Sequence, residues 1–209
     1  INGQPCVLIL GDNLFFGNEL QTMLHKTTSR NGSGATIFAY PVSDPQRYGV
    51  VDFDGDGSLE LIFGDKSGLV HVLSSDGTEW ENDLFPFDTG NEIWGSLAFA
   101  DIDLDGLSEI IVPSKSKYLY ALDINGLDFD VEIGQMLFST PSIGNLDDDA
   151  ELEVVVNGYA SSGDIFVVNH DGSFATIEIN EKALGGVALA DFDGNGQEEI
   201  VIATENEDM

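Results

Sequence analysis

The sequence predicts a mainly β fold, in which a partial β-propeller of four-stranded blades follows a short α/β (β-α-β) segment. Three observations support this fold class. Four similar acidic segments begin 49, 44 and 46 residues apart, short β-branched runs flank each segment, and the charge of the chain changes abruptly at residue 52. We therefore expect two regions, a β-α-β segment over residues 1–51 and three blades plus a truncated fourth over residues 52–209.

The first 51 residues carry the pattern of a strand, a helix and a second strand. The apolar runs Cys6–Leu10 and Ala35–Val42 predict the strands. Between them, apolar residues recur at helical spacing from Leu20, and Asn18 is a residue type that caps helix N-termini. Cys6 is the single cysteine of the chain, so no internal disulfide can form.

Each later repeat predicts up to four strands. An apolar stretch such as Ser96–Ala100 or Val187–Ala190 precedes the acidic segment, and an apolar triplet such as Ile110–Val112 follows it. In three repeats an Asp-Gly or Asn-Gly turn begins 24 to 26 residues after the acidic segment starts, at residues 76, 125 and 171. Four short antiparallel strands in ~46 residues form one propeller blade. The fourth repeat stops before its second turn, so we expect a truncated blade.

The negative charge of the chain lies in these repeats. Residues 1–51 contain three acidic and three basic residues, so residues 52–209 carry the whole formal charge of −31. Such a surface repels a nucleic-acid backbone, which is bound by Lys and Arg, and attracts cations. No apolar run approaches the ~18 residues of a membrane span. We therefore expect no nucleic-acid partner and no transmembrane segment.

The acidic segments, loops 1 to 4 (residues 52–60, 101–109, 145–153 and 191–199), are candidate calcium sites. Oxygen-bearing side chains occupy positions 1, 3, 5 and 9 of each loop, and position 2 is apolar. Such side chains converge on one point, and hard oxygen ligands in this number suit Ca²⁺ better than Mg²⁺, which demands a tighter octahedron. By analogy with other such loops, the carbonyl at position 7 also coordinates, so up to four Ca²⁺ are expected. The predicted ligands are Asp52, Asp54, Asp56, Ser58 and Glu60; Asp101, Asp103, Asp105, Leu107 and Glu109; Asn145, Asp147, Asp149, Glu151 and Glu153; and Asp191, Asp193, Asn195, Gln197 and Glu199.

Two other interpretations of the loops were considered. An EF-hand needs a bidentate Glu at position 12, where all four loops have an apolar residue. Acidic hairpin turns can also be merely solvated, but four copies in register at blade spacing argue against that. Loop 3 is expected to be the weakest site. It has the neutral Asn145 at position 1, and Ala150 replaces a glycine, so the turn must change or Ala150 must adopt a positive φ.

Residues 49–209 resemble the FG-GAP/VCBS repeats of bacterial surface proteins and of integrin α-subunit propellers, whose D-x-D-x-D-G-x-x-[DE] loops bind Ca²⁺. The resemblance implies recognition of an extracellular protein or carbohydrate ligand, or cell adhesion, by a secreted or cell-surface protein. It does not imply catalysis.

A second resemblance covers the start of the chain. The segments Leu10–Gly17, Gly34–Tyr40 and Asp44–Val51 resemble glucose-1-phosphate thymidylyltransferase, a sugar nucleotidyltransferase that uses Mg²⁺. The resemblance implies that Asp12 binds the catalytic metal, that Tyr48 and Gly49 contact the sugar, and that the protein is cytoplasmic.

Several parts of that enzyme family are missing. The sequence has no glycine-rich nucleotide loop followed by Thr-Arg, no E-K-P sugar-binding segment and no identifiable second metal-binding Asp. A single carboxylate without a phosphate cradle cannot position an in-line displacement. A nucleotidyltransferase-like fragment is therefore the alternative function, expected to be inactive as it stands, with Asp12 serving as a turn residue. Because the two resemblances meet inside Val50–Asp54, a fused or chimeric reading frame is also expected.

The remaining aromatic and histidine residues suggest no catalytic group. Trp80, Trp94, Phe85 and Phe87 could form a ligand-binding patch, but aromatic residues filling the space between blades are the more frequent case. The three histidines share no metal-binding spacing, and no Ser-His-Asp arrangement stands out from the acidic loops.

Overall fold

The computed structural model describes residues 49–160, 163–183 and 185–205, all of which belong to the compact unit Ser43–Met209. These residues form sixteen β-strands, and none of them lies in a helix. The mainly β part of the predicted fold class is therefore confirmed for this part of the chain. Residues 1–48 of the predicted β-α-β segment, including Asp12 and Tyr48, lie outside the described residues.

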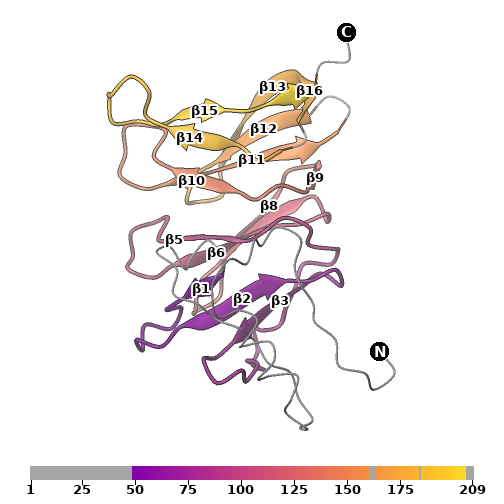
Figure 1. Ribbon diagram of the computed structural model, residues 1–209, viewed down its shortest axis with the longest axis vertical. Helices are drawn as coiled ribbons and strands as arrows, with labels where there is room; N and C mark the ends of the chain where they lie inside the picture. The colour runs from indigo at the N-terminus through magenta and orange to yellow at the C-terminus, as the bar shows by residue number, and fades with distance from the viewer. Residues whose placement is uncertain (1–48, 161–162, 184, 206–209) are drawn as a thin grey trace, which may run out of the picture. The chain divides into compact units, whose positions relative to one another are not determined.

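The strands form antiparallel sheets that follow one another in chain order (Figure 1). The first sheet contains β1 (Val50–Val51), β2 (Glu60–Gly64), β3 (Leu69–Leu73) and β4 (Phe87–Asp88). The second contains β5 (Ala98–Ala100), β6 (Glu109–Pro113), β7 (Tyr118–Leu122) and β8 (Leu127–Glu132). The third contains β10 (Ser142–Gly144), β11 (Glu153–Tyr159), β12 (Gly163–Val168) and β13 (Phe174–Ala183), with β9 (Met136–Leu137) paired to β11 and β16 (Thr204–Glu205) paired to β13. The last sheet contains β14 (Ala188–Ala190) and β15 (Glu199–Val201).

The strands that flank each acidic loop pair in the same register in all four repeats. The residue before position 1 lies opposite the Glu at position 9, in the pairs Val51–Glu60, Ala100–Glu109, Gly144–Glu153 and Ala190–Glu199. Each acidic segment therefore closes a β-hairpin, as the sequence predicted. The second turn signal is also confirmed, because Gly77 and Gly172 donate backbone hydrogen bonds within the turns that follow β3 and β12.

The hydrophobic core lies between neighbouring sheets. Successive side chains of a strand point to opposite faces. On β6, Ile110 and Val112 pack in a cluster with the first sheet, whereas Ile111 packs in a cluster with the third. Every residue of β6 is buried, because both faces of the second sheet are covered. The triplet Ile110–Val112 is thus apolar throughout, as in a strand covered on both sides, whereas Phe63 and Val201 of the first and last triplets are exposed.

Three of the four aromatic residues singled out in the sequence contribute to this core. Phe85 is buried, with its ring centroid 5.8 Å from that of Phe53, and Trp80 and Phe87 pack against the same cluster. Trp94 differs, because 53% of it is exposed. The interpretation as core is confirmed for Phe85, and Trp94 lies on the surface.

Candidate metal centres

The four acidic loops share a set of hydrogen bonds that point their carboxylates inward. In every loop the position-5 N–H donates to the position-3 carboxylate, with distances between 2.9 and 3.1 Å. In loops 1, 2 and 4 the glycine N–H at position 6 donates to the carboxylate at position 1. Short-range bonds of this kind are typical of Asx turns, and they hold alternate side chains on one side of the loop.

The Glu at position 9 has a structural role that the sequence analysis missed. Its Oε2 accepts a hydrogen bond from the backbone N–H of the apolar residue at position 2 in all four loops, at 2.6 to 2.9 Å. Glu60, Glu109 and Glu153 are all buried. The repeated pairing of an apolar position 2 with a Glu at position 9 was the available signal. One carboxylate oxygen therefore closes the loop, and the other is left to face the acidic cluster.

Loop 2 brings four carboxylates together. Oxygens of Asp101, Asp103, Asp105 and Glu109 all lie within 4.8 Å of one another. Asp101 Oδ1 is buried and accepts no hydrogen bond from the described residues. Burial, together with the negative charge of the neighbouring Asp103, raises the pKa of Glu109 to about 8 against the lowering effect of the Ile102 N–H. An unpartnered buried oxygen and a carboxylate that resists ionisation both indicate a site that lacks a positive charge.

Loops 1 and 4 bring together three carboxylates each. The clusters are Asp52, Asp54 and Glu60 in loop 1, and Asp191, Asp193 and Glu199 in loop 4. Asp56, the predicted position-5 ligand, lies outside the cluster and accepts a hydrogen bond from the Ser58 N–H at 2.6 Å. Hydrogen bonds from Ser58 lower the pKa of Asp56. In loop 4, Asn195 Oδ1 likewise accepts from the Gln197 N–H.

Loop 3 has a different turn. Loops 1, 2 and 4 have positive φ angles at positions 4 and 6, whereas neither Asp148 nor Ala150 of loop 3 does. The Ala150 N–H donates to Glu151 rather than to position 1, and Asn145 Nδ2 donates to the Asp149 carbonyl. Of the two outcomes that the sequence allowed for Ala150, the turn has changed. Asp147, Asp149 and Glu153 still cluster.

All four clusters could hold metal ions. Each contains three or four carboxylate oxygens, and hard oxygen donors of this kind suit Ca²⁺ and Mg²⁺. The position-7 residues Ser58, Leu107 and Gln197 direct their N–H groups at the position-5 side chains. Coordination by their carbonyl oxygens stays a prediction, and so does the role of Glu151 at the same position of loop 3.

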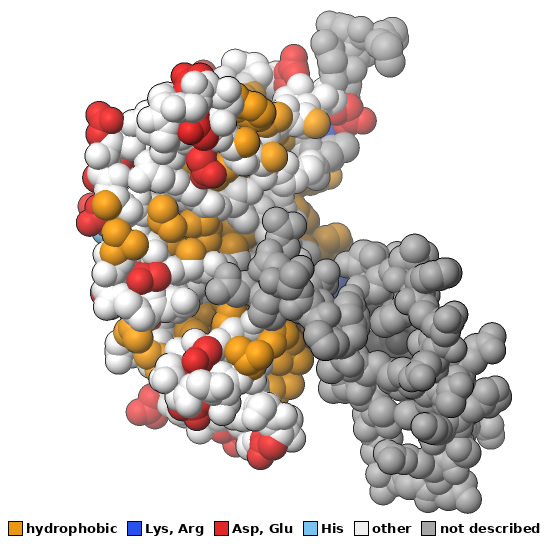
Figure 2. Space-filling model, turned by 60° about the vertical axis from the view of Figure 1, so that its left-hand side comes forward, with side chains coloured by type: hydrophobic (Ala, Val, Ile, Leu, Met, Phe, Trp, Pro, Cys, Tyr) orange, Lys and Arg blue, Asp and Glu red, His pale blue; other side chains and the backbone are white. Residues whose placement is uncertain are grey.

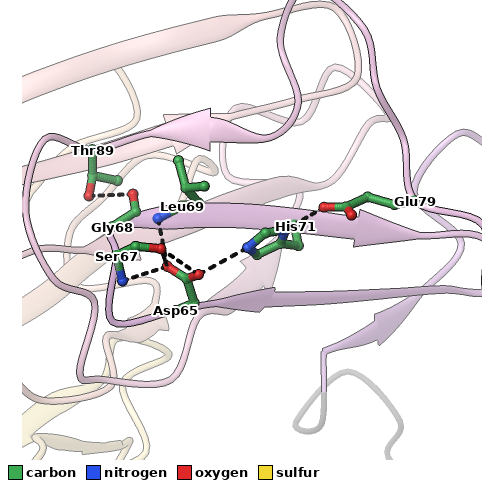
Figure 3. A network of polar contacts seen from close by, with 7 residues as sticks. All are labelled: Asp65, Ser67, Gly68, Leu69, His71, Glu79 and Thr89. Atoms are coloured by element: carbon green, nitrogen blue, oxygen red, sulfur yellow. Dashed lines mark hydrogen bonds and ion pairs between the residues drawn. The ribbon is translucent and has the colours of Figure 1, made fainter. Parts of the chain in front are cut away.

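A second polar cluster surrounds His71 on β3 (Figure 3). The two ring nitrogens contact Glu79 Oε1 and Asp65 Oδ2, the latter at 3.3 Å, and the ring of Phe63 stacks on the imidazole. Burial lowers the pKa of His71, but the hydrogen bonds to Glu79 and Asp65 outweigh it, so the pKa is raised overall. Ser67 Oγ donates to Asp65 and not to His71, so the group lacks the order of contacts of a nucleophilic triad.

Gly49, the described member of the predicted sugar-binding pair, is packed against the first sheet. Its φ is +68°, its carbonyl accepts a hydrogen bond from the Ile62 N–H at 2.7 Å, and a Cβ at this position would lie 2.2 Å from the Ile62 carbonyl oxygen. Only glycine fits there, because both the φ angle and the contact exclude a side chain. A sugar contact of Gly49 stays a prediction.

Two family models match the chain, and one of them begins where the composition changes. Residues 1–64 match the nucleotidyl transferase family, and residues 52–112 match an FG-GAP-like repeat. The two matches overlap over loop 1 and β2, and the overlap includes part of the segment Val50–Asp54 where the two resemblances were expected to meet. Both resemblances stated from the sequence are therefore confirmed over these segments. Neither match indicates a nucleic-acid-binding family.

Curated relatives match only the first part of the chain. A glucose-1-phosphate thymidylyltransferase of Xanthomonas campestris pv. campestris is 46% identical over 59 residues, which are 28% of this chain and 20% of the relative. The enzyme of Neisseria gonorrhoeae is 49% identical over 53 residues, or 25% and 18%. That of Mycobacterium tuberculosis is 46% identical over 57 residues, or 27% and 19%. The chain thus spans about a fifth of the length of these relatives.

Solved structures match the fold of the later part. The crystal structures of BBS1N in complex with ARL6DN, soaked with lead or with mercury, superpose with TM-scores of 0.54 and 0.55 at 12% and 11% identity. Each match covers 76% of this chain and 47% or 51% of the other. At this identity the likeness concerns the fold alone. Among the residues described here, no helix has the length and apolar character needed to cross a membrane.

Proposed function

We propose that residues 49–209 are a calcium-binding β-propeller repeat module that recognises a ligand, as part of a secreted or cell-surface protein. The main support for the calcium proposal is the arrangement of the carboxylates in loop 2. Four carboxylate oxygens converge within 4.8 Å, and one buried oxygen of Asp101 has no partner among the described residues. A bound cation would pair that oxygen and neutralise the repulsion among four acidic groups.

Calcium is favoured over magnesium by the flexible and unequal composition of the loops. The clusters contain three or four carboxylates, to which carbonyl oxygens at position 7 would add. Ca²⁺ accepts six to eight oxygens at variable geometry, whereas Mg²⁺ needs a near-ideal octahedron and retains water. The side chains would hold the ion, and the ion would in turn fix the hairpin between the first two strands of each repeat.

The propeller arrangement is supported by the serial packing of the sheets. The second and third sheets each bury one face against the preceding repeat and the other against the following one, as blades do around a propeller axis. Backbone bonds also join neighbouring loops, because the Leu152 N–H of loop 3 donates to the Ile102 carbonyl of loop 2 at 2.8 Å. Ligand recognition and an extracellular location rest on the likeness of residues 52–112 to FG-GAP-like repeats.

Thermal unfolding of the full chain tests the calcium proposal. We expect millimolar Ca²⁺ to raise the melting temperature relative to EGTA, and equal Mg²⁺ to raise it less. One site stabilises by about 2.7 kcal/mol at a hundredfold excess of ion over Kd. Asp103→Asn should reduce the calcium effect, whereas Asp83→Asn, which removes an exposed acidic charge outside the loops, should leave it unchanged. Identical melting curves in Ca²⁺ and EGTA would contradict the proposal.

A second candidate function, transfer of a nucleotidyl group to a sugar phosphate, is favoured by the match of residues 1–64 to the nucleotidyl transferase family. It would require Mg²⁺ at Asp12. Because the chain spans only about a fifth of such enzymes, we expect no pyrophosphate release from dTTP and glucose 1-phosphate with Mg²⁺. Release that disappears in Asp12→Ala would instead establish this activity.

A further inference from the structure

A row of aromatic rings with lysines beside them lies on the surface of the three complete sheets. The ring centroids of Trp94 and Phe138 are 5.5 Å apart, and those of Phe138 and Tyr159 are 4.5 Å apart. Trp94 and Tyr159 are exposed by 53% and 43%. We call Trp94, Phe138 and Tyr159, together with the lysines that contact them, the aromatic row.

Three lysines are interleaved with these rings. Lys66 and Lys115 each place their Nζ 4.9 Å from the Trp94 ring centroid, and Lys182 places its Nζ 5.8 Å from that of Tyr159. The described residues contain only four lysines and no arginine, so three of their four cationic side chains meet on this row. On the face shown in Figure 2, acidic side chains are scattered over the surface and very few lysines are visible. An anionic ligand would therefore meet most of the described lysines on this row, where Lys115 pairs with Glu92 and Lys182 Nζ lies 3.7 Å from Glu205 Oε2.

The row lies at the opposite end of the strands from the acidic loops. β2, β6 and β11 each begin at the position-9 Glu of a loop and run toward the row, which follows them at Lys66, at Lys115 and at Tyr159 itself. A five-residue strand spans roughly 16 Å. A ligand on the row would thus leave the loops untouched.

The backbone of the row is closely packed, so the rings are held in position. A Cβ on Gly95 would lie 2.6 Å from the Ser139 carbonyl oxygen, which brings the connections that carry Trp94 and Phe138 into contact. Glu92 accepts a hydrogen bond from Trp94 Nε1 at 2.8 Å and another from the Lys115 ammonium group. An ammonium group has three donors, so donors of Lys115 stay available. Among the described residues, Lys66 forms no ion pair.

We propose that the aromatic row binds an acidic glycan, a sugar chain that carries carboxylates. Its rings offer rigid apolar area for the C–H faces of the sugar units, and the interleaved ammonium groups offer charge-assisted bonds to the carboxylates. A polymer that carries both apolar faces and carboxylates matches a surface that offers both rings and ammonium groups. This inference rests on the proposed function, because it assumes that the repeats form a recognition module. It adds the chemical class of the ligand.

Calorimetric titration of the full chain with a hyaluronan hexasaccharide tests the inference. The matched probe is the same hexasaccharide with its carboxylates reduced to alcohols, and hexaglutamate supplies charge without sugar rings. We expect the hexasaccharide to bind, and both other probes to bind at least ~10-fold more weakly. Equal binding of hexaglutamate would overturn the assignment to a glycan, and equal binding of the reduced probe would overturn the role of the carboxylate. Binding of none of the probes would overturn the inference.

Paired variants locate the site. Trp94→Ala and Tyr159→Ala should weaken binding by roughly 10-fold or more, as expected for exposed anchor residues. Phe174→Ala removes an aromatic ring of similar exposure (42%) outside the row and should have no effect. Lys66→Gln should weaken binding, whereas Lys117→Gln makes the same charge change at a lysine that contacts no ring of the row and should not. Unchanged affinity of Trp94→Ala would overturn the assignment.

The calcium proposal can fail separately from this one. Each titration is accompanied by melting curves in Ca²⁺ and in EGTA. If the chain binds the hexasaccharide but its melting temperature does not change with Ca²⁺, the calcium proposal is contradicted and the glycan site is supported. If Ca²⁺ stabilises the chain but the hexasaccharide does not bind, the glycan site is contradicted and the calcium proposal is supported.

Discussion

Loops 2 and 3 have the same length, the same strand register and the same bond from the position-2 N–H to the position-9 Glu. They differ in the turn at their centre. Leu104 and Gly106 of loop 2 have positive φ angles, and the Gly106 N–H donates to Asp101. Loop 3 has neither feature. The strands thus define where an acidic hairpin forms. Loop 3 gathers one carboxylate fewer because Asn145 stands where loop 2 has Asp101, and the turn at positions 4 and 6 differs as well.

The largest expected difference between the two loops is in calcium affinity. Loop 2 gathers four carboxylates and loop 3 gathers three, and the number of charged ligands strongly affects calcium affinity. Asp103→Ala should therefore remove the tightest calorimetric site and about 2.7 kcal/mol of stabilisation at a hundredfold excess of Ca²⁺. Asp147→Ala, the same change at position 3 of loop 3, should remove a weaker site. If Asp147→Ala abolishes the tightest site, the comparison fails.

The second prediction concerns pH in the absence of calcium. Burial raises the pKa of Glu109 from its ordinary value of 4.5 to about 8, so the folded state retains a proton that the unfolded state releases. Stability in EGTA should therefore fall as the pH rises from 4.5 to 8, by at most about 1.4 kcal/mol per pH unit from this group.

Glu109→Gln isolates that contribution, because Gln keeps an oxygen acceptor for the Ile102 N–H but carries no charge. In this variant the fall in stability between pH 4.5 and 8 should be smaller, as measured by urea unfolding in EGTA. Glu153→Gln is the counterpart in loop 3, where burial also raises the pKa of the position-9 Glu. A variant Glu109→Gln with the wild-type pH dependence would show that Glu109 ionises normally in the folded protein.

The sequence predicted those features that depend on a short run of neighbouring residues. The alternating carboxylates, the apolar triplets and the Asp-Gly turns predicted the hairpins and their order, because these depend on neighbouring residues only. The change of turn at Ala150 was one of two outcomes, and it is accompanied by a hydrogen bond from Asn145 Nδ2 to the Asp149 carbonyl.

Other features depend on residues far apart in the sequence and could not be predicted from it. The unpartnered oxygen of Asp101 results from packing around loop 2. Trp80 and Trp94 look alike in sequence, yet Trp80 packs against the first core cluster and Trp94 meets lysines from two neighbouring repeats. Burial of this kind is a tertiary property.

The third prediction converts loop 3 into a loop like the others. The double variant Asn145→Asp with Ala150→Gly restores the acidic position 1 and permits the positive φ at position 6 that Gly106 adopts. We expect the calcium affinity of this site to rise by roughly 10-fold, or about 1.4 kcal/mol, in calorimetric titration. Ala150→Gly alone should give a smaller gain, because the added carboxylate is missing. No gain in the double variant would mean that the turn does not control the affinity.

The smallest predicted effect concerns position 4 and has opposite signs in the two loops. Leu104 has a φ of 61° and is 53% exposed, so its side chain gains little from packing while its backbone is in the left-handed region. Glycine occupies this position in loops 1 and 4, with φ angles of 73° and 75°. Leu104→Gly should therefore stabilise the calcium-free protein by about 0.5–1 kcal/mol, once the entropy that glycine adds to the unfolded chain is subtracted from the relief of backbone strain.

Asp148 has no positive φ, so Asp148→Gly should instead destabilise the protein by about 0.5–1 kcal/mol. Urea unfolding in EGTA measures both, and effects of the same sign would contradict the difference in turn geometry between loops 2 and 3.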